Sequence, residues 1–160
     1  PVALVLTRQA LPTFDRSKVA SASGVTRGAY VLADAPNGRA NVLLLATGSE
    51  VSLCMAARDQ LATEGVQARV VSMPSWEIFA KQPEAYRDEV LPPSVRARVS
   101  VEMGSPFGWA KWIGMEGTSI AMETFGASAP AKVVQEKFGF TTQAVVAAAR
   151  AQVKRHSGVA

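Results

Sequence analysis

The sequence predicts an α/β protein: a three-layer, mostly parallel sheet with one antiparallel edge strand and helices on both faces. Short apolar runs of strand length, Val42–Ala46, Ala68–Met73 and Arg98–Met103, are the first observation that predicts it. Helix-length segments separate these runs, and strands joined by helical crossovers form parallel sheets. The chain has 160 residues, 48% hydrophobic and 19% charged, which suits one compact domain with an appendage and excludes intrinsic disorder.

The chain opens on an apolar run, Val2–Thr7, which we predict to be a strand. A lone strand needs neighbours, and no basic leader precedes this one, so we expect the chain to be a piece of a longer polypeptide. Residues 9–26 are polar and without a period, which indicates a linker between two sheets. Residues 27–34 form the candidate antiparallel edge strand, ended by the Pro-Asn-Gly turn at 36–38.

After the first buried strand, the turn Thr47–Glu50 leads into a helix. Ser49 is expected to cap this helix, Glu50 suits the positive end of its dipole, and Gly65 is placed to end it. The strand at 68–73 is followed by a predicted short helix that carries Trp76 and Phe79. A proline-rich connection, with prolines at 83, 92 and 93, then leads to the next strand.

The last third of the chain predicts a short helical turn, one more strand and two more helices. A short helical turn carries Trp109 and Trp112, and residues 118–122 are a candidate fourth core strand. One helix starts near Pro130, where a proline suits the first turn. The final helix begins at Thr141 or Thr142, and its apolar face is Val145, Val146, Ala149 and Val153.

Charge and composition exclude several function classes. The net charge is +4, but the basic residues are scattered and the aromatic residues sit in apolar contexts, so we expect a solvated, mildly basic surface and no nucleic-acid partner. The densest basic groups are Arg96 with Arg98 and a group at 150–155. No apolar run approaches the roughly 18 residues of a membrane span, so we expect no membrane partner and a cytoplasmic location. One cysteine and one histidine cannot build a disulfide or a zinc site.

Most candidate site residues have a simpler structural interpretation. The Thr47–Glu50 turn lies where α/β folds bind anions, but it has one glycine, no lysine and a glutamate, which favours plain helix capping. Cys54 lies on the apolar side of its helix and is expected to pack as a small hydrophobe. His156 is interpreted as a cation near the negative end of the last helix, and Glu102 as a hydrogen-bonded strand-end carboxylate.

Arg8 directly follows the apolar run at 2–7. It would therefore lie at the carboxyl end of a strand, the edge where open α/β sheets bind ligands. A guanidinium offers a planar fork that suits phosphate or carboxylate. On position alone, a structural salt bridge is the favoured interpretation.

Ordered segments over nearly the whole chain resemble the transketolase family, in the region that runs from the end of its pyrimidine-binding domain through its C-terminal domain. Together these segments are far more specific than any one of them. They are LTRQ at 6–9, RGAYVL at 27–32, ATGSEV at 46–51, ARVVSMPS at 68–75, FGASAP at 125–130 and FGFT at 138–141.

The resemblance implies a domain division and an activity. Residues 1–26 would be the last strand of the pyrimidine-binding domain plus a linker, and residues 27–160 the C-terminal α/β domain. The full-length enzyme would be a homodimer of the pentose phosphate pathway that uses thiamine diphosphate with Mg²⁺ or Ca²⁺ to move a two-carbon ketol unit from a ketose phosphate to an aldose phosphate. The family's catalytic, cofactor and metal residues precede this chain, so the resemblance implies that the chain carries none of them and is inactive alone.

One functional residue carries over from the family. The arginine of its S/T-R-Q motif binds the phosphate of the sugar substrate, and Arg8 occupies that place, which reverses the interpretation from position alone. The resemblance also implies that the C-terminal domain contributes dimer contacts and frames the active-site entrance. Two alternatives stay open: another thiamine-dependent enzyme, such as a 2-oxoacid dehydrogenase component or a deoxyxylulose phosphate synthase, and a free-standing module that binds a nucleotide at Thr47–Glu50.

Overall fold

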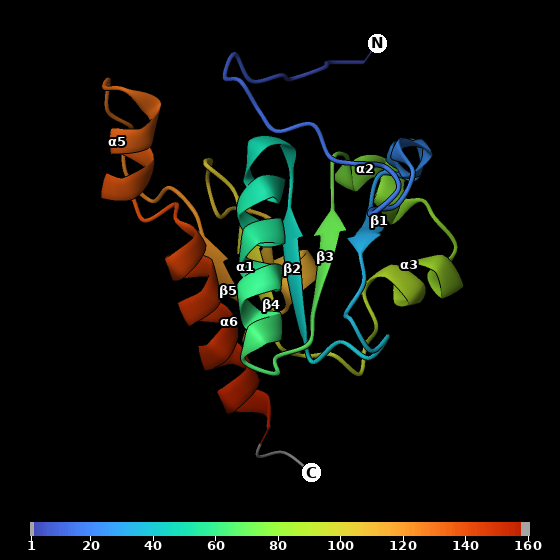
Figure 1. The fold of residues 1–160 in the computed structure, drawn as a ribbon. Helices are drawn as coiled ribbons and strands as arrows, with labels where there is room; N and C mark the ends of the chain where they lie inside the picture. Colours follow the sequence, from blue (N-terminus) through green and yellow to red (C-terminus); the bar gives the residue numbers. More distant parts are fainter. Residues whose placement is uncertain (1, 158–160) are drawn as a thin grey trace.

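The structure is a computed structural model that describes residues 2–157. It contains one five-stranded sheet in the order β1-β3-β2-β4-β5 (Figure 1). All neighbouring strands pair in parallel except β1 and β3, which are antiparallel, so the predicted fold class is confirmed. The strands are β1 (Tyr30–Ala33), β2 (Val42–Ala46), β3 (Ala68–Ser72), β4 (Arg98–Val101) and β5 (Thr118–Ile120).

Helices cover both faces of this sheet. The helices α1 and α6 pack on one face, where Figure 1 shows them in front of the strands, and α2, α3 and α4 pack on the other. The helices are α1 (Val51–Thr63), α2 (Trp76–Ala80), α3 (Glu84–Val90), α4 (Ala110–Ile113), α5 (Ala131–Lys137) and α6 (Thr142–His156), with short 3₁₀ turns η1 (Ala22–Arg27) and η2 (Gly48–Glu50).

The central strand β2 is buried on both sides, which explains its uninterrupted apolar sequence. All five of its residues are fully buried. Leu44 pairs with Val70 of β3 and with Val99 of β4, and it belongs to the core beneath α1 and α6. The alternate side chains Leu43 and Leu45 belong to the opposite core, as the period of two in a strand requires.

The second core is aromatic and depends on one glycine. The rings of Trp76 and Trp109 meet edge to face with centroids 4.9 Å apart, and Phe79 is fully buried beside them. Gly28, at the end of η1, has a φ of +83°, and a Cβ there would lie 2.3 Å from the backbone nitrogen of Phe79. Only glycine allows this close approach of the chain to α2.

The structure adds one helix that the sequence analysis missed. Helix α3 occupies the segment expected to be a proline-rich connection. Pro83 is the N-cap residue of α3, and Pro92 follows its end, both being positions where proline is compatible with a helix. The prolines therefore bound a helix instead of excluding one.

The segment Val2–Thr7 forms no strand in this structure, so the strand that we predict for it within a preceding domain stays a prediction. The valine and leucine side chains at positions 2, 4, 5 and 6 are 75–96% exposed, and no strand among residues 2–157 pairs with the segment. A strand is stable only with hydrogen-bonding neighbours, so the β-pattern of this segment alone does not form one. The linker that follows contains η1, which Ser21 caps by accepting a hydrogen bond from the backbone nitrogen of Ser23.

In the part of the chain that the structure describes, no helix is both long and apolar enough to cross a membrane.

Candidate functional site

The candidate site lies at the carboxyl edge of the sheet, between β2 and β4. The chain leaves β2 for α1 on one face and leaves β4 for α4 on the other, so the direction of winding switches between these neighbours. In open α/β sheets, ligands bind outside the carboxyl ends of the strands at such a switch point. Two loops meet there, the turn Thr47–Glu50 after β2 and the segment Glu102–Gly104 after β4.

Glu50 fills the turn after β2 with a buried carboxyl group. Its side chain is 5% exposed, and the Ser49 hydroxyl donates to its Oε1 at 3.1 Å. Burial, with a smaller contribution from the charge of Glu102, raises the pKa of the Glu50 carboxyl above its ordinary value. The expected Ser49 cap is wrong, because this hydroxyl donates to a carboxylate and no side chain caps α1. A carboxyl group in this turn disfavours a bound phosphate there.

Glu102 has a structural partner, as the sequence analysis expected. Its Oε2 accepts a hydrogen bond of 2.5 Å from the indole nitrogen of Trp109, which is fully buried. The bond joins the loop after β4 to the start of α4. Glu102 therefore positions the aromatic core beneath the switch point.

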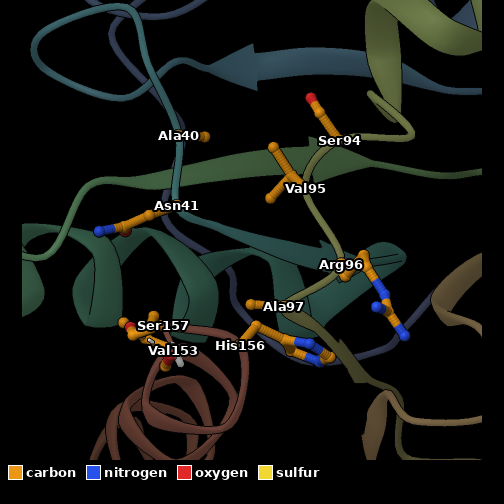
Figure 2. Close-up of a pocket in the computed structure, with 9 residues that line it drawn as sticks. All are labelled: Ala40, Asn41, Ser94, Val95, Arg96, Ala97, Val153, His156 and Ser157. Carbon is orange, nitrogen blue, oxygen red and sulfur yellow. Dashed lines mark hydrogen bonds between the residues drawn. The ribbon is translucent and has the colours of Figure 1, made fainter. Parts of the chain in front are cut away.

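Cys54 and His156 lie away from this edge. Cys54 is fully buried in the core under α1, and burial raises the pKa of its thiol, so it packs as the small hydrophobe expected. His156 is in the last turn of α6, at the opposite edge of the sheet. Figure 2 shows it on the wall of a cavity of about 190 Å³ that Arg96 and Asn41 also line.

The described residues do not fit a thiamine diphosphate and metal site. Among residues 2–157, no three His, Cys, Asp or Glu side chains come together in a group that could hold a metal ion. The two carboxyl groups at the switch point are poor ligands, because Glu50 is buried with a raised pKa and Glu102 accepts from Trp109. Mg²⁺ requires ionised oxygen ligands that remain open to it and to the diphosphate.

Arg8 lies in an exposed segment, at a bend of the chain, and not at the end of a strand of this structure. Within residues 2–157 it forms no ion pair, so the salt bridge favoured by its position alone is not found there. Figure 1 shows the segment crossing above the carboxyl edge of the sheet. Among the described residues, no hydrogen bond or ion pair joins Arg8 to Glu50 or Glu102.

One residue at this edge was missed by sequence reasoning. The side-chain nitrogen of Gln135 in α5 lies 3.4 Å from Oε1 of Gln9, the residue after Arg8, and 3.8 Å from the sulfur of Met103. No local pattern signals a contact between positions 126 residues apart. The proximity of Glu50 to Glu102, in contrast, could have been found, because one lies in the turn after β2 and the other directly follows β4, two buried parallel strands.

Comparison with known proteins identifies the family. The sequence model of the transketolase-like TK C-terminal domain matches residues 28–141. A transketolase from Halalkalibacterium halodurans is 54% identical over 151 residues, which cover 94% of this chain and 22% of that protein. Transketolase 1 of Escherichia coli is 49% identical over 150 residues, again 94% of this chain and 22% of the relative. The chain thus spans about a fifth of the length of these relatives.

Solved structures give the same result. A structure of transketolase from Pichia stipitis in complex with sedoheptulose 7-phosphate matches 94% of this chain and 21% of that chain, with a TM-score of 0.83 and 36% identity. Transketolase from Leishmania mexicana matches 85% of this chain and 19% of that chain, with a TM-score of 0.77 and 44% identity. Since the family model, the relatives and the fold all agree, the chain belongs to the family of transketolase-like C-terminal domains.

Proposed function

We propose that this chain is the C-terminal part of a transketolase, which moves a two-carbon ketol unit from a ketose phosphate to an aldose phosphate. The observation that carries the proposal is the 54% identity to a transketolase over 94% of the chain. Residues 1–26 are then the end of a pyrimidine-binding domain plus a linker, and residues 27–160 the C-terminal domain.

The cofactor of the full-length enzyme is thiamine diphosphate with Mg²⁺ or Ca²⁺, which supplies the electron sink for carbanion chemistry. Its ligands belong to the rest of the polypeptide, because the carboxyl groups at the switch point of this chain are engaged or buried. The 160-residue chain is therefore inactive alone. Its surface contributes to the homodimer and to the frame of the active-site entrance, and the enzyme works in the cytoplasm.

Arg8 is the substrate-binding residue of this chain, and its role is to hold the phosphate of the sugar. The Arg8 side chain is exposed and forms no ion pair among residues 2–157. Its guanidinium group is therefore not occupied by a carboxylate of this domain. A guanidinium can hold a dianionic phosphate through two parallel hydrogen bonds. The phosphate lies far from the reacting carbonyl, so the contact exists in both the bound substrate and the transition state and strengthens binding more than turnover.

The test is ketol transfer by the full-length polypeptide that contains this chain. We expect transfer between a ketose phosphate and an aldose phosphate that requires added thiamine diphosphate and Mg²⁺, and none by residues 1–160 alone. Full-length protein that binds thiamine diphosphate but decarboxylates a 2-oxoacid instead would assign the chain to another thiamine-dependent enzyme. Ketol transfer by residues 1–160 alone would contradict the proposal that the cofactor ligands and catalytic residues lie in the rest of the polypeptide.

A further inference from the structure

Two carboxyl groups from neighbouring loops lie close together at the carboxyl ends of β2 and β4. Glu50 is 5% exposed and Glu102 is half-buried, and the charge of Glu102 acts on Glu50. The other groups that face Glu50 are the Ser49 hydroxyl, the Met103 backbone N–H and the Cys54 thiol. Among the described residues, no lysine, arginine or histidine forms an ion pair with either carboxyl group. This chain alone buries Glu50, so further parts of a longer polypeptide can only increase the burial.

Two ionised carboxyl groups in this place are unfavourable. A buried charge without a cationic partner loses its hydration, and two like charges at close range repel each other. One of the two groups therefore keeps a proton at lower pH. Glu50 is the group that keeps it, because it is the more buried, whereas Glu102 accepts from an indole N–H, a contact that suits an ionised oxygen.

Glu102 is also the side chain that holds the loop between β4 and α4. The backbone nitrogen of Glu102 donates to the carbonyl of Ile120 at 3.0 Å, so the start of this loop is fixed to β5. The tip that follows, residues 105–108, has backbone hydrogen bonds within itself and to the start of α4. The bond from the buried indole of Trp109 to the Glu102 carboxylate closes the loop over these residues.

We propose that Glu50 and Glu102 form a pH-sensitive switch that opens and closes the tip of this loop. While Glu50 is protonated, Glu102 keeps its bond to Trp109 and the tip is closed. When Glu50 loses its proton to water, its new charge repels Glu102, whose less buried side chain turns to solvent. The buried indole N–H then lacks an acceptor, which is unfavourable, and the tip opens. The tip carries Phe107, which is 89% exposed, so the switch changes the surface at the carboxyl edge of the sheet.

Hydrogen–deuterium exchange of the full-length protein, read on a peptide that contains residues 105–109, tests this switch between about pH 6 and 9. Glu50→Gln is uncharged at every pH, and Glu102→Gln removes the other charge but keeps an oxygen that can accept from Trp109. Glu123→Gln is the matched control, because Glu123 is exposed and forms no ion pair among the described residues. Comparing the parent and each variant at the same pH cancels the pH dependence of chemical exchange.

Glu50 binds its proton more tightly in the closed loop, so rising pH favours the open loop. Relative to Glu50→Gln, exchange at the tip of the parent should rise by about tenfold across the range, since a pKa that differs by about one between the two loop states changes their ratio tenfold. Glu102→Gln should behave like Glu50→Gln, and Glu123→Gln like the parent.

Equal exchange in the parent and in Glu50→Gln at every pH would overturn the inference, and a cation from the rest of the polypeptide that pairs with Glu102 would produce that result. If Glu50→Gln does not fold, the comparison of Glu102→Gln with Glu123→Gln decides. A pH response in Glu102→Gln as large as that of the parent would then refute the switch.

Discussion

Arg98 should be one of the most important polar residues for the stability of this domain. Its guanidinium donates to four backbone carbonyls: Val95 at 2.9 Å, Trp112 at 2.7 Å, Leu91 at 3.2 Å and Pro92 at 2.9 Å. These carbonyls belong to the connection between α3 and β4 and to the end of α4. Burial lowers the pKa of Arg98, and no carboxylate pairs with it among the described residues. The Arg98 side chain therefore connects the start of β4, by hydrogen bonds, to the preceding loop and to the end of α4.

The substitution Arg98→Met should destabilise the domain by about 3 kcal/mol. Methionine keeps most of the buried stem and removes every donor. A buried carbonyl left without a partner costs about 1–3 kcal/mol, and we expect water to reach roughly half of the four in this half-buried site. For a chain of this size, about 3 kcal/mol corresponds to a fall in Tm of roughly 6–12 °C.

Urea unfolding followed by tryptophan fluorescence measures this loss, because Trp109 and Trp112 lie in the core beside the site. The matched control is Arg39→Met, since Arg39 is exposed and its guanidinium makes no hydrogen bond among residues 2–157. For the control, we expect the free energy of unfolding to change by no more than about 0.5 kcal/mol. For Arg98→Lys we expect an intermediate loss of this free energy, because one ammonium group cannot reach all four carbonyl acceptors. A loss below about 1 kcal/mol for Arg98→Met would refute the reasoning.

Two further predictions concern Glu50 and Gly28. Because the folded-state pKa of Glu50 is raised, its contribution to stability is fully present below its unfolded pKa and is lost as pH rises through the folded value. Glu50→Gln should therefore gain stability relative to the parent as pH increases from 4 to 8, and equal pH profiles in urea unfolding would contradict this. Gly28→Ala should cost about 3 kcal/mol through strain at positive φ and collision with α2, whereas Gly126→Ala, where nothing lies within 4 Å, should be nearly neutral by thermal unfolding.

The sequence predicted the parts of the fold that depend on local pattern. The run Val42–Ala46 is the buried central strand, and residues 30–33 form the antiparallel edge. The sequence does not predict helix α3, because prolines on both sides of a short segment indicate a loop, although both lie at positions that are compatible with a helix. The strand at 2–7 was predicted from a pattern that requires partner strands, and no strand of this sheet pairs with it.

The polar contacts of the site and of the loops around β4 are less predictable, because they join segments that are far apart in the sequence. Arg98 was interpreted as part of a solvated basic surface, but its four acceptors become visible only when two loops fold over the start of β4. Gln135 resembles any helical surface glutamine until α5 is brought next to Gln9. Residue type and spacing carry no information about such partners.

The phosphate role of Arg8 is tested most directly by Arg8→Ala in the full-length enzyme, with kinetics on paired phosphorylated and unphosphorylated ketose donors. Hydrogen bonds to a charged group contribute about 1.5–3 kcal/mol, so KM for the phosphorylated donor should rise about ten- to a hundredfold with kcat largely kept. Arg8→Lys should bind the phosphorylated donor more tightly than Arg8→Ala does, because lysine keeps the positive charge but cannot form the two parallel hydrogen bonds of a guanidinium. The unphosphorylated donor should respond little to either change. An equal fold-change on both donors would contradict the account, because it would make Arg8 a structural residue.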